Sequence, residues 1–344
     1  MREAVLLVGG QGTRLRPLTL TTPKPLLPVA GVPFLAHQLA GLRQAGVDHV
    51  VLATSYRAEI FQETFGDGTP LGLRLTYLHE NEPLGTGGAI RNAAEGLQSQ
   101  TDEPVVILNG DVLSGHDLAA QVDAHLAVGA DVTLHLVEVA DARAYGCVPT
   151  DDDGRVTAFL EKMEHPVSSW INAGAYVFRR SVIDAIPAGK VVSVERDTFP
   201  DLLAAGRRVQ AWKETAYWCD VGTPEALVRC SADVVLGVAP SAAQRLAPAL
   251  AWFADGYRPP SDVRVIGGST VLAGSAIESG AVVDASIVMS GALIGADAQV
   301  TRSIIGSGAV VGSGSVVVES AVADTAVVPP GTHLAPGSRV EATG

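Results

Sequence analysis

The sequence predicts two kinds of domain, an α/β domain with a mainly parallel sheet and, after it, a parallel β-helix. Up to about residue 240, short apolar runs alternate with amphipathic stretches, as in α/β folds whose sheet is covered by helices on both faces. Beyond residue 263, apolar residues recur at every sixth position among Gly, Ser and Ala, the pattern of hexapeptide coils. A chain of 344 residues, 47% of them apolar, is long enough for two such domains.

The α/β part is expected to build its sheet from short apolar runs. These strands are predicted at 4–8, 49–54, 73–79, 104–109, 131–139, 156–159 and 173–178. One helix is predicted over 34–46, and a second is expected to have Ser114 as its N-cap, with apolar residues at intervals of four at Leu118, Val122 and Leu126. A third is predicted to start after Thr223 as N-cap, because a proline follows at the first helical position.

The repeat that predicts the β-helix has a period of six. Its apolar positions are Ile304, Val310, Val316, Val322, Val328, Leu334 and Val340, and the same period runs upstream in a shifted frame at Val282, Val288, Ile294 and Val300. Each unit is expected to form one flat side of a three-sided coil. The expected bounds are 1–236 for the α/β domain, 237–262 for a proline-rich linker and 263–344 for the β-helix.

Charge and composition exclude several classes of protein. The net charge of −13 argues against binding of duplex nucleic acid, which depends on Lys and Arg neutralising phosphates. The three cysteines form no C-x-x-C pair, which suits a reducing compartment, so a cytoplasmic location is expected. No stretch approaches the ~18 apolar residues of a membrane span, and no membrane partner is expected.

A glycine-rich loop followed by cations comes directly after the first predicted strand. Gly9, Gly10 and Gly12 let backbone N–H groups come close to anionic oxygens. Their spacing matches neither the dinucleotide fingerprint nor the P-loop. Arg14 suits bidentate phosphate contacts, and Lys24 stands between two prolines that restrict its backbone. The loop therefore predicts a phosphate site of a third kind.

This loop and the motifs after it resemble those of the sugar-nucleotide pyrophosphorylases, which join a sugar 1-phosphate to a nucleoside triphosphate. Residues 9–25 have the form G-G-x-G-T-R-L-x-P-L-T…P-K-P, and further motifs follow in the family's order at 80–88, 108–111, 159–162, 172–174 and 218–222. With the hexapeptide coil, the resemblance covers nearly the whole chain. It implies a nucleotidyltransferase domain with a Rossmann-like, mixed, mainly parallel sheet, followed by a left-handed β-helix.

Within the family, the sequence resembles the mannose-1-phosphate guanylyltransferases at 7–10, 45–50, 82–86 and 193–200. This implies an enzyme that forms GDP-mannose and pyrophosphate from GTP and α-D-mannose 1-phosphate. The alternatives are a glucose-1-phosphate thymidylyl- or uridylyltransferase and a heptose-1-phosphate guanylyltransferase. A non-enzymatic alternative is a regulatory subunit that binds nucleotide sugar.

The resemblance also implies roles for single residues. Arg14, Lys24 and Asp111 are expected to be catalytic, and Asp111 and Asp220 to bind Mg²⁺. The nucleotide is expected to contact Val8, Gly9, Gly10, Gly12, Thr13, Arg14, Glu80 and Gly85. The sugar phosphate is expected to contact Asn109, Gly146, Glu161, Lys162, Asn172 and Gly174. A homo-oligomer through or beside the β-helix is also expected.

The chemistry of such a reaction explains these residue types. The attacking phosphate oxygen is already an anion, so the reaction depends on charge neutralisation and in-line positioning and needs no general base. Two carboxylates with phosphate oxygens and water are the ligands that Mg²⁺ prefers. A carboxylate at Glu80 is suited to accept hydrogen bonds from the N1–H and N2–H₂ donors of guanine, which thymine lacks.

Overall fold

The computed structural model describes residues 2–55, 58–80, 82–160, 162–244 and 246–342. Packing divides the chain into two compact units, Met1–Gly10 with Leu39–Trp218 and Gln11–Gln38 with Cys219–Gly344. The segment from Gln11 onward therefore packs with the C-terminal part of the chain, although in sequence it directly follows the first strand. The expected domain bounds follow sequence order and not packing, and they stay a prediction.

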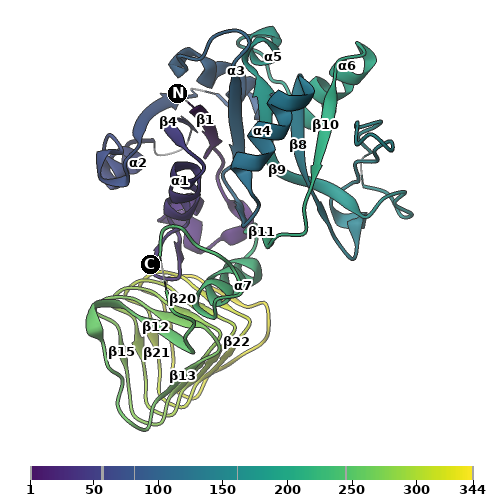
Figure 1. Cartoon of the computed structure of the whole chain (residues 1–344). Coiled ribbons are helices and arrows are strands. Elements are labelled where there is room, and N and C mark those ends of the chain that lie inside the picture. The colour runs from purple at the N-terminus through teal and green to yellow at the C-terminus, as the bar shows by residue number, and fades with distance from the viewer. Residues whose placement is uncertain (1, 56–57, 81, 161, 245, 343–344) are drawn as a thin grey trace. The chain divides into compact units, whose positions relative to one another are not determined.

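The first unit is built on one mixed sheet (Figure 1). Seven of the described strands lie in it in the order β10-β8-β9-β6-β1-β4-β5. They are β1 (Arg2–Leu7), β4 (Val47–Thr54), β5 (Arg74–His79), β6 (Pro104–Asn109), β8 (Val132–Glu138), β9 (Trp170–Arg179) and β10 (Val209–Lys213). β9 is antiparallel to β6 and β8, and the other pairings are parallel. The predicted mainly parallel, Rossmann-like sheet is confirmed, and its parallel strands end at one edge, where α/β sheets bind ligands.

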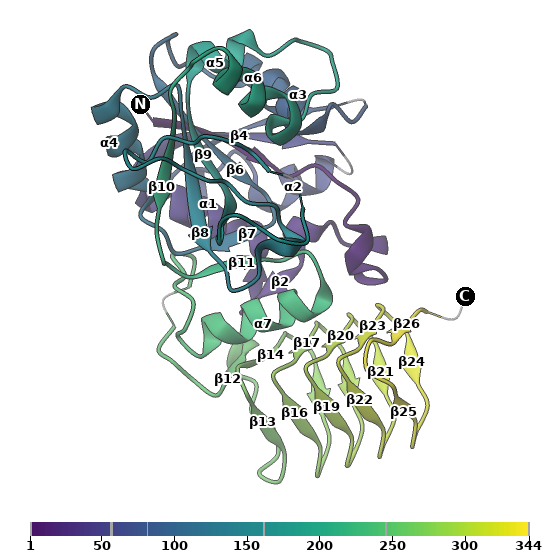
Figure 2. The ribbon, with the colours of Figure 1, turned by 90° about the vertical axis from the view of Figure 1, so that its right-hand side faces the viewer.

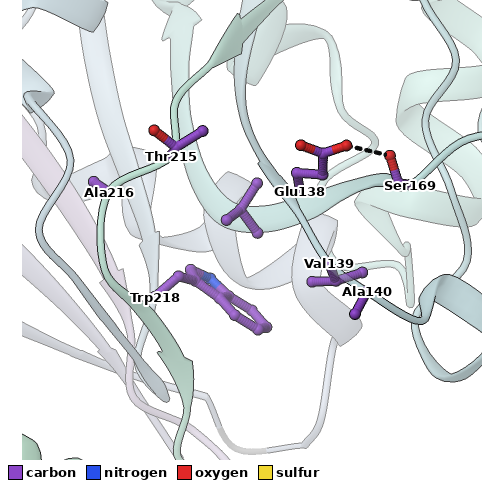
Figure 3. A pocket seen from close by; sticks show the side chains of 8 residues that line it. Glu138, Val139, Ala140, Ser169, Thr215, Ala216 and Trp218 are labelled. Atoms are coloured by element: carbon purple, nitrogen blue, oxygen red, sulfur yellow. Dashed lines mark hydrogen bonds between the residues drawn. The ribbon is translucent and has the colours of Figure 1, made fainter.

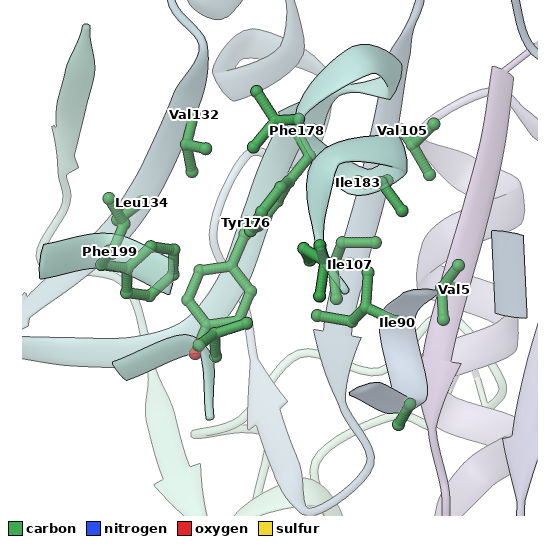
Figure 4. Packing of buried hydrophobic residues seen from close by; sticks show 14 of the residues in the cluster. Val5, Ile90, Val105, Ile107, Val132, Leu134, Tyr176, Phe178, Ile183 and Phe199 are labelled. Atoms are coloured by element: carbon green, nitrogen blue, oxygen red, sulfur yellow. The ribbon is translucent and has the colours of Figure 1, made fainter. Parts of the chain in front are cut away.

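Helices pack on this sheet and bury its apolar side chains. They are α2 (Ala58–Phe65), α3 (Gly85–Ala93), α4 (Leu118–Val128), α5 (Arg180–Ala185) and α6 (Phe199–Ala204). The first residues of α1 (Phe34–Gln44) belong to the second unit and its later residues to the first. In the core of the unit, the rings of Tyr176, Phe178 and Phe199 lie with their centroids between 5.5 and 6.1 Å apart (Figure 4). This aromatic cluster fixes β9 against α6.

Several local predictions for this unit are corrected. The predicted strand at 156–159 does not form; Val156 makes only an isolated bridge to Thr150. The N-cap of α4 is Asp117, whose Oδ1 accepts from the Ala120 N–H at 2.9 Å, and not Ser114. Leu126 is 52% exposed and so does not belong to the core. β10 and α6, which no prediction included, complete the edge of the sheet.

The second unit contains α7 (Pro224–Val235), the hairpin β2 (Pro28–Val29) and β3 (Val32–Pro33), and the β-helix. α7 starts as predicted, because Thr223 Oγ1 accepts a hydrogen bond from the Ala226 N–H at 3.3 Å. No helix in the described part of the chain combines the length and apolarity needed to cross a bilayer. Among the described residues, two further short strands, β7 (Val112–Ser114) and β11 (Trp218–Asp220), pair with each other.

The β-helix stacks parallel strands into three sheets, one on each side of the coil (Figure 2). The first is β12 (Ala251–Phe253), β14 (Ser269–Val271), β17 (Ile287–Val288), β20 (Ile304–Ile305), β23 (Ala321–Val322) and β26 (Arg339–Val340). The second is β13 (Arg264–Ile266), β16 (Val282–Asp284), β19 (Gln299–Thr301), β22 (Val316–Val318) and β25 (His333–Leu334). The third is β15 (Ala276–Ile277), β18 (Leu293–Ile294), β21 (Val310–Val311) and β24 (Val327–Val328). The arrangement is consistent with the predicted left-handed β-helix, and β12 lies inside the segment predicted as a linker.

The coils in the middle of the β-helix take 17 residues and not the 18 that three hexapeptides require. Val283 pairs with Val300 and Val300 with Val317, whereas the first coil, from Val265 to Val283, and the last, from Val322 to Val340, each take 18. The strict six-residue period predicted from Ile304 is therefore wrong before Val322, where the inward-facing residues lie one position later than predicted. The fully buried apolar residues there are Val311 and Val317, whereas their neighbours Val310 and Val316 are partly exposed. The reason is that one side of these coils has five residues.

A repeated corner closes this short side. Ala285, Arg302 and Glu319 adopt left-handed conformations there, with φ between 44° and 46°. A buried serine follows each of them, and these serines form a ladder. The N–H of Ser303 donates to Ser286 Oγ at 3.0 Å, and the N–H of Ser320 donates to Ser303 Oγ at 3.0 Å. The ladder satisfies backbone donors that the tight corner turns inward.

Candidate active site

In the first unit, the end of β1 leads into the predicted nucleotide loop. The N–H of Val8 donates to Ala53 O at 3.1 Å, and Val8 is buried, so the loop begins from a fixed point. Gly9 and Gly10 are exposed, and the N–H of Gly10 donates to Ser55 Oγ at 3.3 Å. Gly10 has φ 118°, a conformation that side chains rarely tolerate. The loop thus leaves β1 with its backbone exposed at the carboxyl edge of the sheet.

Asp111 is placed by the end of β6. The N–H of Gly110 donates to Leu7 O at 3.0 Å, and a Cβ on Gly110 would lie 2.3 Å from that oxygen. Only glycine therefore fits between Asn109 and Asp111. The close approach holds the ends of β6 and β1 together, so Asp111 lies beside the start of the glycine loop.

A bulge in β9 forms the predicted sugar-binding segment. Along β8, Leu134 and Leu136 pair with Tyr176 and Asn172, so β9 uses four residues where β8 uses two. Gly174 lies in the bulge with φ 76°, and a Cβ there would lie 2.8 Å from Asn109 Nδ2. Bulges of this kind re-aim side chains next to active sites. Here the bulge brings Asn172, Gly174 and Asn109 together, three residues that the sequence had predicted as one site.

A network with Glu195 at its centre lies behind this segment, and the sequence reasoning assigned it no role. Tyr176 is fully buried, and its hydroxyl donates to Glu195 Oε1 at 3.5 Å. Glu195 Oε2 accepts from the hydroxyls of Thr86 at 3.1 Å and Ser193 at 3.0 Å. Burial, and then the carboxylate of Glu195, raise the pKa of Tyr176 well above its usual value, so the phenol keeps its proton. The acidic residue within Ser193-Val-Glu-Arg was the available sequence signal.

Gly85 and Glu80 lie at the start of α3, where nucleotide contacts are predicted. Gly85 has φ 72°, and a Cβ on it would lie 2.6 Å from Val192 O. That same oxygen accepts from the Gly87 N–H at 2.8 Å, so the helix start is tied to backbone far along the chain. The N–H of Leu84 donates to Glu80 Oε2 at 3.4 Å. Burial raises the pKa of Glu80, against the lowering effect of the Leu84 N–H and of His79.

A cavity of about 650 Å³ opens in the first unit at the carboxyl end of β8 (Figure 3). It is lined by Val137, Glu138, Val139, Ala140, Ser169, Thr215, Ala216 and Trp218. The indole N–H of Trp218 donates to Ala173 O at 3.0 Å, and its ring meets Tyr145 edge-on at 5.7 Å between centroids. Trp218 therefore separates this cavity from the segments that bear Asn172 and Gly146.

The remaining sugar-site predictions are Gly146, Glu161 and Lys162. Gly146 has φ 75°, and its N–H donates to Ala142 O at 3.2 Å in the turn after Tyr145. Lys162 is exposed in the segment before β9. Glu161 lies outside the described residues. Cys147 is buried in a small apolar core against which Trp218 packs.

In the second unit, the cationic part of the loop folds over small residues. Gly12 has φ 57°, its carbonyl accepts from Thr19 Oγ1 at 2.8 Å, and a Cβ on it would lie 3.2 Å from Lys24 Cβ. Arg14 passes over Gly222, where a Cβ would lie 2.7 Å from a guanidinium nitrogen. Thr13 and Arg14 are exposed. The glycines of two motifs, 9–12 and 218–222, therefore make room for the two predicted catalytic cations.

The donor chemistry at the predicted metal site suits Mg²⁺. Asp111 belongs to the first unit and Asp220 to the second, so their joint action on one metal stays a prediction. Among the described residues, no group of three or more His, Cys, Asp or Glu gathers as a ready-made metal site. Mg²⁺ is commonly held by one or two carboxylates, with substrate phosphates and water completing its shell. Carboxylates at 111 and 220 fit that requirement.

Comparison with known proteins agrees with this geometry. The chain belongs to the Nucleotidyl transferase family, whose sequence model matches residues 3–235. It is a sugar-nucleotide pyrophosphorylase similar to mannose-1-phosphate guanylyltransferases. It is 52% identical over 283 residues to the "Mannose-1-phosphate guanylyltransferase" of Mycobacterium tuberculosis, which covers 82% of this chain and 78% of that protein. Proteins of this family generally use Mg²⁺.

Two further relatives extend the comparison. The "Mannose-1-phosphate guanylyltransferase catalytic subunit beta" of Drosophila pseudoobscura pseudoobscura is 41% identical over 224 residues, 65% of this chain and 60% of the fly protein. A crystal structure of HddC from Yersinia pseudotuberculosis complexed with GMP-PN has a TM-score of 0.59 at 31% identity, over 68% of this chain and all of that chain. The chain thus spans less than two thirds of the fly protein's length.

Proposed function

We propose that this enzyme forms GDP-mannose and pyrophosphate from GTP and α-D-mannose 1-phosphate, with Mg²⁺ as cofactor. The observation that carries the proposal is 52% identity to the mycobacterial mannose-1-phosphate guanylyltransferase over 82% of the chain. The six sequence motifs between residues 9 and 222 all lie within residues 3–235, the part of the chain that the family model matches.

In this mechanism, an oxygen of the sugar phosphate attacks the α-phosphorus of GTP and pyrophosphate leaves. The protein positions the two substrates and neutralises their charges, and it needs to supply no general base. Arg14 and Lys24 neutralise the triphosphate, and the crowding of Gly12 against Lys24 supports a fixed place for the ammonium. Asp111 and Asp220 would hold the Mg²⁺, which when bound would neutralise charge on the phosphate oxygens.

The sugar phosphate lies against the β9 bulge in this proposal. Asn172 and Gly174 meet the sugar hydroxyls, and Asn109 supports them from the end of β6. Their placement is supported by the bulge, because it turns the Gly174 backbone toward Asn109. Lys162 binds the sugar phosphate, Glu161 binds hydroxyls, and Gly146 lets the backbone come close to the sugar.

The guanine base is assigned to the region of Glu80, Gly85 and Val8–Gly10. A partly buried carboxylate at Glu80 accepts hydrogen bonds from the two N–H donor groups of guanine, and a pyrimidine without these donors leaves that carboxylate unsatisfied. Glu80 lies directly after β5, five residues before α3 begins at Gly85, and this placement supports the assignment.

We also propose a cytoplasmic homo-oligomer that assembles through or beside the β-helix. The three cysteines are buried free thiols, which suits a reducing compartment. The oligomer is tested by light scattering of the full chain, and a monomer would contradict it.

The function itself is tested by a pyrophosphate-release panel with the full chain. GTP, dTTP, UTP, ATP and CTP are each crossed with mannose, glucose and heptose 1-phosphates, with and without Mg²⁺. We expect the highest kcat/KM for GTP with mannose 1-phosphate, and turnover only with the metal. A higher kcat/KM for another pair would overturn the substrate assignment, and no turnover with any pair would favour a regulatory subunit.

A further inference from the structure

The segment Gln11–Gln38, which bears Arg14 and Lys24, belongs to the same compact unit as the β-helix. Its contacts with the coils fall on or beside one sheet, β12-β14-β17-β20-β23-β26, whose strands lie in a row along the stack (Figure 2). The segment touches this side near the first coil and again near the last.

Near the first coil, the end of the segment is held by close packing and hydrogen bonds. A Cβ on Gly31 would lie 2.3 Å from a ring carbon of Trp252, so the indole of β12 fits directly against this glycine. The Ala30 N–H donates to Ser231 Oγ at 2.9 Å, and that hydroxyl lies 3.0 Å from Thr270 Oγ1 of β14. The hairpin end of the segment is therefore bound to α7 and to the first strands of the sheet.

Near the last coils, two polar contacts hold the cationic end. Thr21 Oγ1 donates to Asp324 Oδ2 at 2.6 Å, and Arg339 Nη1 donates to the carbonyl oxygen of Arg16 at 2.7 Å. The carboxylate of Asp324 is itself oriented, because its Oδ1 accepts from the Ser307 N–H at 2.7 Å in the preceding coil. Both contacts involve charged groups, and such hydrogen bonds are the stronger ones.

These two contacts lie within three residues of the predicted catalytic cations. Arg16 is two residues from Arg14, and Thr21 is three residues from Lys24. The loop that bears these residues is folded back on itself, because Thr19 Oγ1 donates to Gly12 O at 2.8 Å. A shift at Arg16 or Thr21 would therefore be passed on to Arg14 and Lys24.

We propose that Asp324 and Arg339 are positioning residues, through which the β-helix sets the place of the loop that bears Arg14 and Lys24. The β-helix then acts on the nucleotide half of the reaction and not only on assembly. The identity of the nucleotide rests on the proposed function, whereas the contacts do not depend on it. A displacement of about 1 Å in a catalytic group can reduce the rate by up to ~100-fold.

The first test is steady-state kinetics with the full chain and whichever substrate pair the unaltered enzyme uses best. Arg339→Met and Thr21→Val each remove one contact and keep much of the side-chain volume. We expect the KM for the nucleotide to rise, or kcat to fall, by roughly 10-fold, with the KM for the sugar phosphate changed less than 2-fold. Arg339→Lys retains a donor and should recover most of the loss.

The matched control is Arg302→Met. Arg302 is also a β-helix arginine, but its ion pair, 2.8 Å to Glu319, joins two successive coils. This variant should leave both KM values unchanged. Equal effects of Arg339→Met and Arg302→Met, or equal effects on both substrates, would overturn the proposal, since either result would indicate a merely structural role.

The second test needs no activity. Trypsin does not cut after Arg16 or Lys24, because proline follows each, so the Arg14–Leu15 bond is the site that reports on this loop. Leu15 is fully buried, which protects that bond while the loop is held. Release of the peptide ending at Arg14, followed by mass spectrometry, should be about 5-fold or more faster in Arg339→Met and Thr21→Val than in Arg302→Met. Equal rates would overturn the proposal even if the substrate assignment is right, and faster release would support it even if that assignment fails.

Discussion

The side-chain amide of Asn172 donates a 2.8 Å hydrogen bond to the hydroxyl of Tyr176, four residues further along the same strand. Four residues of a regular strand span about 13 Å, so these groups meet only because β9 bulges at Gly174. The same hydroxyl contacts Glu195, which accepts from Thr86 at the start of α3. The bulge therefore links the predicted sugar residues to the predicted nucleotide helix.

Tyr176→Phe should weaken the sugar site while leaving the fold intact. The change removes the acceptor of the Asn172 amide and a donor to Glu195, at a cost of roughly 1–2 kcal/mol. We expect the KM for the sugar 1-phosphate to rise roughly 5- to 30-fold, measured by pyrophosphate release. Tyr257→Phe is the control, because it also removes a tyrosine hydroxyl from a partly buried hydrogen bond, 2.9 Å from the Ile277 N–H, but in the β-helix. Equal KM values for the two variants would contradict the role of Tyr176.

Gly110→Ala should abolish most activity and lower stability. Its Cβ would lie 2.3 Å from Leu7 O, so the ends of β1 and β6 must separate. We expect a loss of at least about 2 kcal/mol in the free energy of unfolding, measured by urea denaturation.

The matched control for Gly110 is Gly41→Ala, in the middle of α1. A Cβ there meets nothing within 4 Å, and alanine favours helix by up to about 1 kcal/mol. That variant should be as stable as the unaltered chain or more so. A stable and active Gly110→Ala variant would show that the close approach of the two strand ends is not required.

Asp111→Asn should reduce kcat by roughly 100-fold or more, the scale seen when one electrostatic element of a catalytic site is removed. Raising the Mg²⁺ concentration should recover part of the loss, because the amide is a weaker ligand. Asp152→Asn, an exposed aspartate in the turn after Thr150, is the control. Unchanged turnover and unchanged Mg²⁺ dependence in Asp111→Asn would remove this residue from the metal site.

The preference for GTP should depend on pH through Glu80. Burial raises the pKa of this carboxyl, so its charged form is present above that raised value and is lost as the pH falls through it. The ratio of kcat/KM for GTP over dTTP should therefore fall as the pH is lowered. The midpoint of this fall should lie at a higher pH than the pKa of an exposed glutamate. Glu80→Gln should lower the ratio by roughly 5- to 100-fold and make it independent of pH; exposed Glu82→Gln should change neither. A pH-dependent ratio in Glu80→Gln would place guanine recognition elsewhere.

Stability at neutral pH should depend on buried Glu3. Burial by itself raises the pKa of Glu3, but the hydrogen bond from His49 and the N–H groups of Ser99 and Gln98 outweigh it and lower the pKa to about 2. Because this value lies below the ordinary 4.5, the stabilisation is complete above pH 4.5 and is lost as the pH falls toward 2. Its size at pH 7 is on the order of 3 kcal/mol.

Thermal unfolding of Glu3→Gln measures this contribution. The Tm of the variant should lie well below that of the unaltered chain at pH 7, and the two should converge toward pH 3. Asp123→Asn removes only an exposed ion pair with Arg2 and should change the Tm little at any pH. A constant difference between pH 7 and pH 3 would show that Glu3 does not titrate with a lowered pKa.

The sequence by itself determined the class of each part and the motifs of the site. Strand runs such as 104–109 and the Thr223 cap are encoded locally, because apolar runs and capping hydroxyls act over a few neighbouring residues. The six motifs in order were enough to indicate the family, since four of them combine a glycine, which lets the backbone approach a phosphate, with a charged residue.

Only the tertiary structure decided the register of the coils and strands and the contacts between residues that are distant in sequence. The coil length of 17 was hidden because apolar residues come in pairs, Ile304 with Ile305 and Val310 with Val311, so either could be the buried one. The bulge at Gly174 depends on the lengths of two strands far apart in sequence. The docking of Arg16 and Thr21 on Arg339 and Asp324 spans more than 300 residues. No local pattern encodes such contacts, because they arise when the side chains of distant segments pack.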